Sequence, residues 1–596
     1  FQDTTPDSDD KNELPEQNVV KKTRKTDLDT NNNTQDNSKT NDTYSNIFIL
    51  ACIIGVTLGI VLEIINAVNR NPKNDSCYEK HKYWVYSASS DVENKNGLLK
   101  HVHIVLDRIG YEKSTNETPW DLLWSHDYPF RSLYPNLHRL KSRQKVNHFP
   151  GTGYITNKVD LATTDSKYIP KAFKLPQSKE EFKKYAEMNK NSVFLEKHNQ
   201  HRGVFLKNVS EIDVSSGESF VQEFVQKPFL VDGHKFDIGV YVVVTSVNPL
   251  RVYWYKGDVL FRYCPAKYNP FDPRNLDKYV IGDDYLPTWE VPSLAHPYSA
   301  LGFSMKHAFD IYARSKGKDP SRMWAEVQSA IAEVFIKKER HIIDALKHYP
   351  SAENFFEMMR FDLVVDENLK VYLLEANMSP NLSSAHYPPN QLLYEQVLYN
   401  LFSITGVRNQ GNCLEDVNQS FEFCPNVMGL PIYRTHCPLN EIVLICPHHT
   451  ASVNCLFLKM RFAHEIRSSK AHLAFKVSVH SISLTISIHQ TAAVQNMVSS
   501  QKNIAVFGSE CSTICNDNCE SAEFCKLCKP CLDAKLRSSL LTAHKEFLHR
   551  GDFRRLIPPS MDMTSLEEKL KHLTPNNKLQ YLWYQGKCNE DITWCT

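Results

Sequence analysis

Two apolar runs, residues 361–366 and 369–377, restrict the possible fold of this chain more than any other segment. A short polar loop separates them, which is typical of two antiparallel strands in a hairpin. Polar side chains nevertheless occur in both runs, with Asp362 in the first and Glu375 and Asn377 in the second. Since side chains alternate between the two faces of a strand, we expect these three groups to share one face of a sheet.

The register that we expect for this hairpin places Asp366 opposite Leu369, and therefore Asp362 opposite Leu373. Asp362 and Glu375 are then diagonal neighbours, roughly 7–8 Å apart at the backbone and within reach of one shared ion. Two carboxylates and an amide oxygen suit a hard cation that keeps waters or phosphate oxygens, so the pattern predicts Mg²⁺. A solvated sheet face with unrelated carboxylates is the alternative.

A candidate phosphate-binding segment lies upstream, at residues 193–206. Lys197 ends an apolar strand there, and Arg202 and Gly203 follow in the next loop. A lysine ammonium is a common phosphate ligand, and glycine allows a loop backbone to approach a ligand closely. The segment therefore predicts contacts with the phosphates of a nucleotide, although an exposed lysine beside an ordinary loop has the same pattern.

Two further strands are expected after this segment, at residues 219–225 and 237–247. The first offers a strand edge against which a nucleotide base can lie. Lys235 and Asp237 precede and begin the second strand, close to the expected phosphates, although Asp237 is also an ordinary turn former. The residues expected along the strand edge are Gln222, Glu223, Phe224 and Val225.

The region at residues 77–410 mixes strand-like and helix-like segments, which predicts an α+β domain of enzyme size. Residues 251–263 have the pattern of a hairpin with a turn at "KGD", and residues 321–349 have helical periodicity. The formal net charge of +1 provides no overall field that would attract nucleic acid, so no nucleic-acid partner is expected.

The N-terminal part contains a polar tail and an apolar run. Residues 1–46 have few aliphatic side chains, and we expect them to be disordered. Residues 47–69 are apolar and long enough for a single transmembrane helix, with a buried soluble helix or a signal sequence as the alternative. The flanking basic residues favour a cytosolic catalytic domain. The glycosylation sequons at Asn116 and Asn208 keep a lumenal location open.

The C-terminal region, residues 411–596, differs in its cysteine content, since it holds thirteen of the sixteen cysteines. Residues 475–490 alternate between apolar and polar side chains, which predicts one long strand. Six cysteines lie within residues 511–531. They suit zinc in the cytosol or disulfides in an oxidising compartment, and their pairing does not follow from the sequence.

Several segments between residues 120 and 385 occur in an order that resembles the tubulin–tyrosine-ligase-like family, whose members have an ATP-grasp fold. These segments are "WDLLWSHDYPF", "QKVNHFPGTGYITNKVDLAT", "IPKAFKLP", "EKHNQHRGVFL", "VQEFVQKPFLVDGHKFD" and "FDLVVDENLKVYLLEANMSPNL". The resemblance covers nearly half of the chain. It implies an ATP-grasp-type ligase domain between the transmembrane helix and the Cys-rich region.

The resemblance also implies roles for single residues. Lys158 and Lys197 correspond to the phosphate-binding lysines, and Arg202 and Gly203 to the loop that closes over the phosphates. Arg262 corresponds to an arginine that binds the incoming amino acid or the acyl-phosphate. The remaining implied contacts are the adenine hinge at Gln222 to Val225, the nucleotide contacts Lys235 and Asp237, and the magnesium ligands Asp362, Glu375 and Asn377.

The activity implied by the resemblance is the ATP-dependent addition of an amino acid, with glutamate expected first, to a carboxylate of tubulin or another acidic protein. ATP and Mg²⁺ are the expected cofactors, and an acyl-phosphate is the expected intermediate. The chain departs from the family at "KFDIG", where Gly239 stands in place of an arginine. A nucleotide-binding pseudoenzyme that binds microtubules or a partner is therefore the alternative, and a ligase for a lumenal protein is a third possibility.

Overall fold

The computed structural model describes residues 80–88, 97–115, 118–198, 204–215, 219–408, 504–515, 518–561 and 573–596. The chain divides into two compact units, Phe1–Ser76 and Cys77–Thr596, and all described residues belong to the second. The expected tail at 1–46, the apolar run at 47–69, the strand expected at 475–490, and the sequon at Asn116 lie outside these ranges. Within the described ranges, no helix has both the length and the apolar character needed to cross a membrane.

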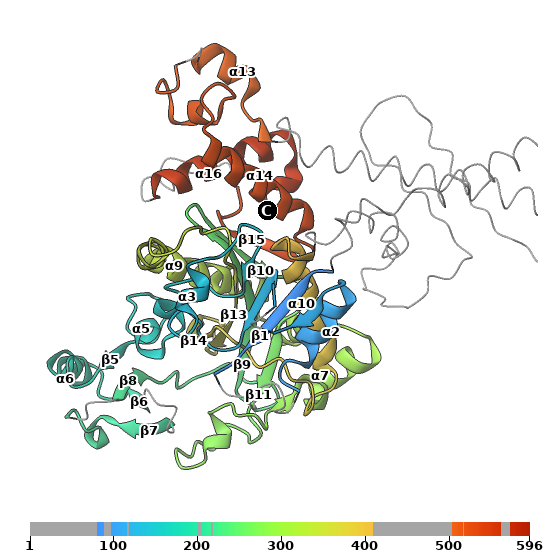
Figure 1. The fold of residues 1–596 in the computed structure, drawn as a ribbon. Helices are drawn as coiled ribbons and strands as arrows, with labels where there is room; N and C mark the ends of the chain where they lie inside the picture. The colour runs from blue at the N-terminus through green and yellow to red at the C-terminus, as the bar shows by residue number, and fades with distance from the viewer. Residues whose placement is uncertain are drawn as a thin grey trace, which may run out of the picture. The chain divides into compact units, whose positions relative to one another are not determined.

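The described residues form three sheets. The first is parallel and is drawn in blue in Figure 1. Its strand order is β2-β1-β3-β4, and helix α2 (Lys100–Arg108) connects β1 to β2, as a parallel pair requires. Helix α2 buries Val102, Val105 and Leu106, which belong to the main hydrophobic core. The strands are β1 (Lys82–Tyr86), β2 (Glu112–Ser114), β3 (Leu122–Ser125) and β4 (Lys145–Val146).

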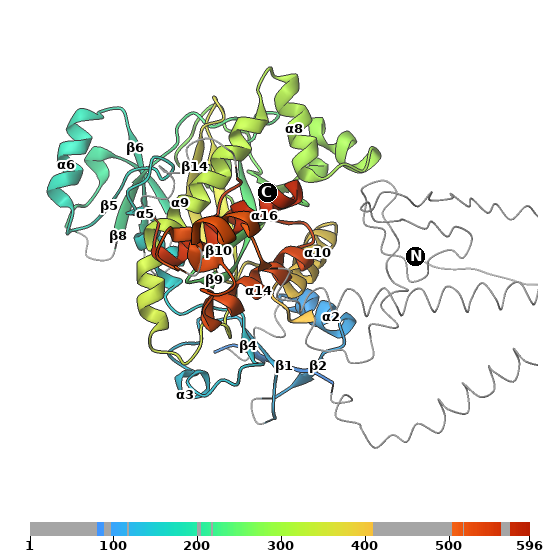
Figure 2. The same ribbon diagram turned by 90° about the horizontal axis from the view of Figure 1, so that it is seen from above.

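The second sheet is antiparallel, with the order β5-β8-β6-β7. Helix α6 (Lys179–Met188) covers it, because Phe182 and Ala186 on one side of this helix pack against Phe173, Phe194 and Val221 of the strands. Figure 2 shows this helix and sheet together at one side of the view. The strands are β5 (Ala172–Lys174), β6 (Val193–His198), β7 (Val204–Asn208) and β8 (Ser219–Glu223).

The third sheet has seven strands and is built around β9 (Phe236–Val247). The start of β9 pairs with β11 (Leu260–Tyr263) and its end with β10 (Leu250–Tyr255), while β13 (Glu357–Val365) pairs along its other edge. The remaining strands are β12 (Leu286–Pro287), β14 (Val371–Asn377) and β15 (Phe553–Ile557). The prediction of a hairpin at residues 251–263 is wrong: β10 and β11 each pair with β9, which is long enough for both.

Helix α9 (Pro320–Leu346) packs against this sheet and contacts β9, β10, β14 and β15. It confirms the helix predicted at residues 321–349. The other long helices of this region are α8 (Met305–Ser315) and α10 (Asn390–Ile404). Short helices are α3 (Tyr134–Leu137), α4 (Gly153–Thr156), α5 (Lys158–Ala162), α7 (Pro292–Ala295) and α13 (Gly508–Glu510).

The hairpin of β13 and β14 exists, but its predicted register is wrong. Asp366 N–H bonds to the Lys370 carbonyl, 3.0 Å away, and Leu369 lies at a φ of 61°, so the turn is longer than two residues. A β-bulge follows between Asp362 and Leu363. The bulge adds one residue to β14. The longer turn and the bulge together shift the register by two residues, so Asp362 lies directly opposite Glu375 rather than diagonal to it.

The C-terminal region returns to the third sheet, where β15 pairs with β10. Figure 1 shows its helices α14 (Ala534–His549) and α16 (Pro575–Glu590) beside these two strands. Disulfides join the cysteines of residues 511–531, so the structure favours disulfides over the zinc alternative. The pairs are Cys511–Cys528, Cys515–Cys525 and Cys519–Cys531, with a fourth disulfide at Cys588–Cys595.

A buried ion pair attaches this C-terminal region to the sheet. Arg251 of β10 donates to both carboxylate oxygens of Glu546 in α14, from Nε at 2.8 Å and from its terminal nitrogen at 3.1 Å. The Tyr253 hydroxyl donates to the same carboxylate at 2.8 Å. The Gln580 side chain of α16 accepts from Arg251 and donates to the Leu250 carbonyl. The polar atoms of this contact are thereby paired inside the protein.

Candidate active site

One face of the third sheet carries a row of charged and amide side chains. Strand pairing places Asp362 opposite Glu375, and Arg360 opposite Asn377, and paired residues of antiparallel strands point to the same face. The Asn377 side-chain amide donates to Asp362 Oδ2 at 3.0 Å. The structure therefore brings together the three predicted magnesium ligands, although their role as ligands stays a prediction.

Arg262 of β11 joins two carboxylates on this face. Its Nε and terminal nitrogen donate to both oxygens of Asp237, at 3.0 and 2.7 Å. The same terminal nitrogen lies 3.0 Å from Asp362 Oδ2. Since Arg262 is opposite Asp237 in the strand register, the sheet itself fixes this arrangement. The predicted catalytic arginine and the predicted metal ligand are thus in direct contact.

Arg360 is a charged residue of this face that sequence reasoning missed. Its Nε donates to Asp362 Oδ1 at 2.7 Å, and its terminal nitrogen donates to Oδ2 at 2.9 Å. Burial alone would raise the pKa of Asp362, but the guanidinium groups of Arg360 and Arg262 outweigh burial and hold this pKa below its usual value. The available signal was an arginine within the apolar run "EMMRFDLVV", two residues before Asp362 and so on the same face.

The three predicted lysines come from three separate parts of the chain, with Lys235 just before β9. Lys158, at the start of α5, lies 3.1 Å from Glu375 Oε1. Lys197 of β6 donates to the side-chain oxygen of Gln222 at 2.8 Å, and Lys235 donates to the Tyr279 carbonyl at 3.0 Å. The electrostatic neighbours of Lys197 include Glu375 and both other lysines, which places the three ammonium groups around one region.

A buried network sets the position of Lys158. The Glu357 carboxylate accepts from the backbone N–H of Phe149 and from the Thr152 hydroxyl, and it also bonds to the His148 ring. This fixes the segment that leads into α4 and α5. Gly151 has a φ of 86° there, and a Cβ at this residue would lie 2.9 Å from atoms of α9, so only glycine allows this close packing.

Side chains of the predicted base-contacting edge, Gln222 to Val225, already have partners inside the protein. Glu223 accepts from the Tyr185 and Ser192 hydroxyls at 2.8 and 2.6 Å, and Phe224 belongs to one hydrophobic cluster with Tyr268 and Tyr279. A nucleotide contact here would therefore use the backbone, and that contact stays a prediction. Arg202 and Gly203 lie outside the described residues.

The donors of this face fit a nucleotide with a divalent cation. Asp362 Oδ1 accepts from Arg360 Nε, and a carboxylate oxygen has two acceptor sites. Glu375 meets Lys158 through Oε1. Carboxylate oxygens beside an amide are the ligand set that Mg²⁺ prefers. Three lysines around the same carboxylate carry more positive than negative charge, as phosphate binding requires.

Lys197 gives this site a pH dependence, because burial and two neighbouring lysines lower its pKa to about 8, while Glu375 acts in the opposite direction. The ammonium is charged below this pKa and neutral above it, so raising the pH removes positive charge from the site. We expect the Kd for ATP, measured by calorimetry, to rise between pH 7 and pH 9, approaching about tenfold per unit above the pKa. A K197R variant, which stays charged, is the control, and a wild-type Kd that is flat over this range would contradict the assignment.

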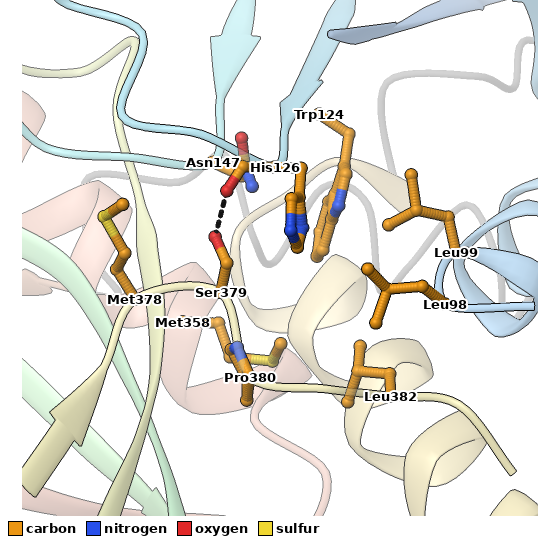
Figure 3. A pocket seen from close by; sticks show the side chains of 10 residues that line it. All are labelled: Leu98, Leu99, Trp124, His126, Asn147, Met358, Met378, Ser379, Pro380 and Leu382. Carbon is orange, nitrogen blue, oxygen red and sulfur yellow. Dashed lines mark hydrogen bonds between the residues drawn. The ribbon is translucent and has the colours of Figure 1, made fainter. Parts of the chain in front are cut away.

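Two surface hollows lie elsewhere. Figure 3 shows the first, where Trp124 and His126 face Met358 and the segment from Met378 to Pro380. Its volume of about 10 Å³ holds one water at most. A second hollow of about 370 Å³ is lined by Tyr285, Trp289, Glu290 and Tyr387, among others. None of the three lysines lines either hollow.

Comparison with known proteins agrees with this geometry. Residues 137–413 match the family model described as "Tubulin-tyrosine ligase family". A probable tubulin polyglutamylase of Caenorhabditis elegans, ttll-15, is 36% identical over 510 residues, which is 84% of each chain. The tubulin polyglutamylase TTLL6 of Mus musculus is 30% identical and covers 53% of this chain and 41% of its own length.

The tubulin monoglutamylase TTLL4 of Homo sapiens is 27% identical over 51% of this chain and 27% of its own length. The chain thus spans less than half the length of these mammalian relatives. The nematode relative is matched over most of both chains, and the family model covers the segment from β4 to the end of α10. On this evidence, the chain belongs to the tubulin-tyrosine ligase family.

Proposed function

We propose that this protein is an ATP-dependent ligase that adds an amino acid, with glutamate as the first candidate, to carboxylates of tubulin or another acidic protein. The observation that carries the proposal is the convergence of Lys158, Lys197 and Lys235 on the sheet face that holds Asp362 and Glu375. The relatives are named as tubulin polyglutamylases and a tubulin monoglutamylase, which supports tubulin as the first acceptor to test.

The proposed mechanism assigns positioning and charge stabilisation to the side chains. Bound ATP with Mg²⁺ would supply the phosphoryl group that activates the acceptor carboxylate. Lys158, Lys197 and Lys235 would hold the phosphates, and Asp362, Glu375 and Asn377 would hold the cation. Arg262, which is 16% exposed, would face the developing negative charge on the reacting carboxylate and stabilise it. No protein nucleophile is needed for this reaction.

The pseudoenzyme alternative depended on the absence of an arginine at Gly239. Arg360 provides a guanidinium across the same residue, since a Cβ at Gly239 would lie 2.9 Å from Arg360 Cδ. A site that has lost its function needs neither the Arg360 guanidinium nor the three predicted metal ligands Asp362, Glu375 and Asn377, yet this site has all of them. We therefore favour an active ligase.

The experiment uses the purified full chain in detergent with ATP, Mg²⁺, tubulin and labelled glutamate, glycine or tyrosine. We expect incorporation of glutamate into tubulin above that of an E375Q blank. The same assay is repeated with acidic proteins of an extracytosolic fraction in place of tubulin. If the protein binds ATP but incorporates none of the three amino acids into either acceptor, the result favours the pseudoenzyme.

A second candidate acceptor, an acidic protein of an oxidising compartment, is supported by the four disulfides found among the described residues. Structural disulfides form in such compartments and are rare in the cytosol. The sequon residue Asn208 is exposed at the end of β7. If residues 47–69 anchor the protein in a membrane, the disulfides and the exposed sequon favour a lumenal catalytic domain. The basic residues that flank this segment favour the opposite orientation, with the domain in the cytosol.

The thiol state in cells distinguishes the two locations. We expect rapid acid quenching and alkylation to leave the eight cysteines of these disulfides unmodified, and an N-glycosidase to shift the mass at Asn208. Eight alkylated cysteines and an unglycosylated Asn208 would place the domain in the cytosol, together with tubulin.

A further inference from the structure

Arg360 and Gly239 form a complementary pair on neighbouring strands. Gly239 of β9 lies opposite Asp362 of β13, and Arg360 precedes Asp362 by two residues on the same face. A Cβ built on Gly239 would lie 2.9 Å from Arg360 Cδ, 3.3 Å from Nε and 3.4 Å from Cγ. Cβ atoms essentially never approach other atoms as closely as 2.9 Å, so the Arg360 side chain has its observed course only because residue 239 is glycine.

The course of this side chain ends on one carboxylate. Arg360 is 6% exposed and donates to both oxygens of Asp362 in a bidentate arrangement. Bidentate arginine–carboxylate pairs fix the plane of the carboxylate as well as its position. Arg262 and Asn377 contact only Oδ2, so Arg360 alone among these three donors also holds Oδ1.

We propose that Arg360 is a positioning residue of the active site, which supplies from β13 the guanidinium that a side chain at residue 239 would otherwise supply from β9. Its function is to hold the Asp362 carboxylate in the orientation that a cation with bound nucleotide requires. The proposal rests on the proposed function. It explains how a chain with glycine at this point of β9 keeps a complete set of charges.

The test is a swap of the two residues. In R360G the Asp362 carboxylate loses its bidentate partner, and we expect kcat to fall by about 10–100-fold, as for other residues that orient a metal ligand. In G239R the new side chain collides with Arg360, so a comparable loss is expected. In G239R/R360G the space is free, and an arginine directly opposite Asp362 can reach its carboxylate. We expect the double variant to recover at least tenfold of the kcat lost in R360G.

Two more variants separate positioning from stability. R360K keeps the charge but cannot bind both oxygens, and we expect it to lower kcat nearly as much as R360G with an unchanged KM for glutamate. R555K changes a buried arginine of β15, whose donors bond to backbone carbonyls, and should lower Tm without changing kcat. If Arg360 acts only through folding, a loss of stability must itself lower kcat. Tm and kcat would then fall together in R360K, and they would also fall together in the control R555K.

A binding measurement keeps the proposal testable if the protein ligates none of the amino acids tried. Calorimetry with a non-hydrolysable ATP analogue, with and without Mg²⁺, reads the cation site directly. We expect R360G to weaken only the Mg²⁺-dependent part of binding, and the double variant to restore it. If the double variant is no better than R360G in both kcat and Mg²⁺-dependent binding, the proposal is wrong. If the wild-type protein ligates no amino acid but the double variant restores Mg²⁺-dependent binding, only the proposed ligase activity is overturned.

Discussion

An E375Q variant is expected to ligate amino acids about 10²–10³-fold more slowly than the wild-type protein, with little change in Tm. Glutamine keeps the shape of the side chain but removes one of the two predicted anionic ligands of the cation. Removing a single group that stabilises transition-state charge has effects of this size. Glu375 is also the ion-pair partner of Lys158 at 3.1 Å, and it raises the pKa of Lys197.

The loss of Glu375 therefore acts on the lysines as well as on the cation. Without this carboxylate, the pKa of Lys197 falls further, and the affinity for ATP should decline at a lower pH than in the wild-type protein. The matched control is E367Q in the turn of the same hairpin, where Glu367 lies at the surface, 3.9 Å from Lys227. Initial rates with labelled glutamate should be normal for E367Q. An E375Q rate within threefold of wild type would remove Glu375 from the site.

The second large effect concerns stability. An E546A variant is expected to lower the free energy of unfolding by about 3–5 kcal/mol, because it leaves the Arg251 guanidinium buried without its counter-charge. Arg251 is 3% exposed and Glu546 is 4% exposed, so water cannot replace the missing carboxylate. Denaturation in guanidinium chloride, followed by tryptophan fluorescence, measures the change.

Two controls define this result. E590Q removes a carboxylate at the end of α16 that pairs with Lys587 and is 49% exposed, and a change within about 0.5 kcal/mol is expected there. R251M/E546L replaces both charges with apolar side chains and should recover much of the stability lost in E546A. If E546A unfolds at the wild-type denaturant concentration, the C-terminal helices do not stabilise the sheet through this pair.

The hairpin illustrates how far the sequence predicts the site. Alternation along one strand was sufficient to place Glu375 and Asn377 on one face, because that rule depends only on strand geometry. Asp362 was added through the predicted register, which was wrong by two residues, and an even shift keeps a side chain on the same face. The bulge at Leu363 was not predictable, since it depends on how β13 fits against β9 as well as β14. The longer turn and the bulge each shift the register by one residue, so Glu375 lies directly opposite Asp362 rather than diagonal to it, on the same face.

Residues far apart in the chain account for most of what was missed. Proximity in sequence predicts that β10 pairs with β11, whereas in the structure each of them pairs with β9, which is long enough for both. Arg360 was not predicted, because the space that its side chain occupies beside Gly239 is visible only when β9 and β13 lie side by side. The ion pair of Arg251 and Glu546 joins residues 295 positions apart, and no local pattern predicts it.

The pairing of β15 with β10 also has a consequence for biosynthesis. Strand β10 (Leu250–Tyr255) is synthesised long before β15 (Phe553–Ile557), the strand that covers its outer edge. Until then, the edge of β10 has unpaired backbone N–H and C=O groups that can pair with another chain. Contacts of such long range also form slowly. A chain that stops before residue 553 therefore leaves this edge of β10 open for pairing with other chains, which favours aggregation over a smaller folded enzyme.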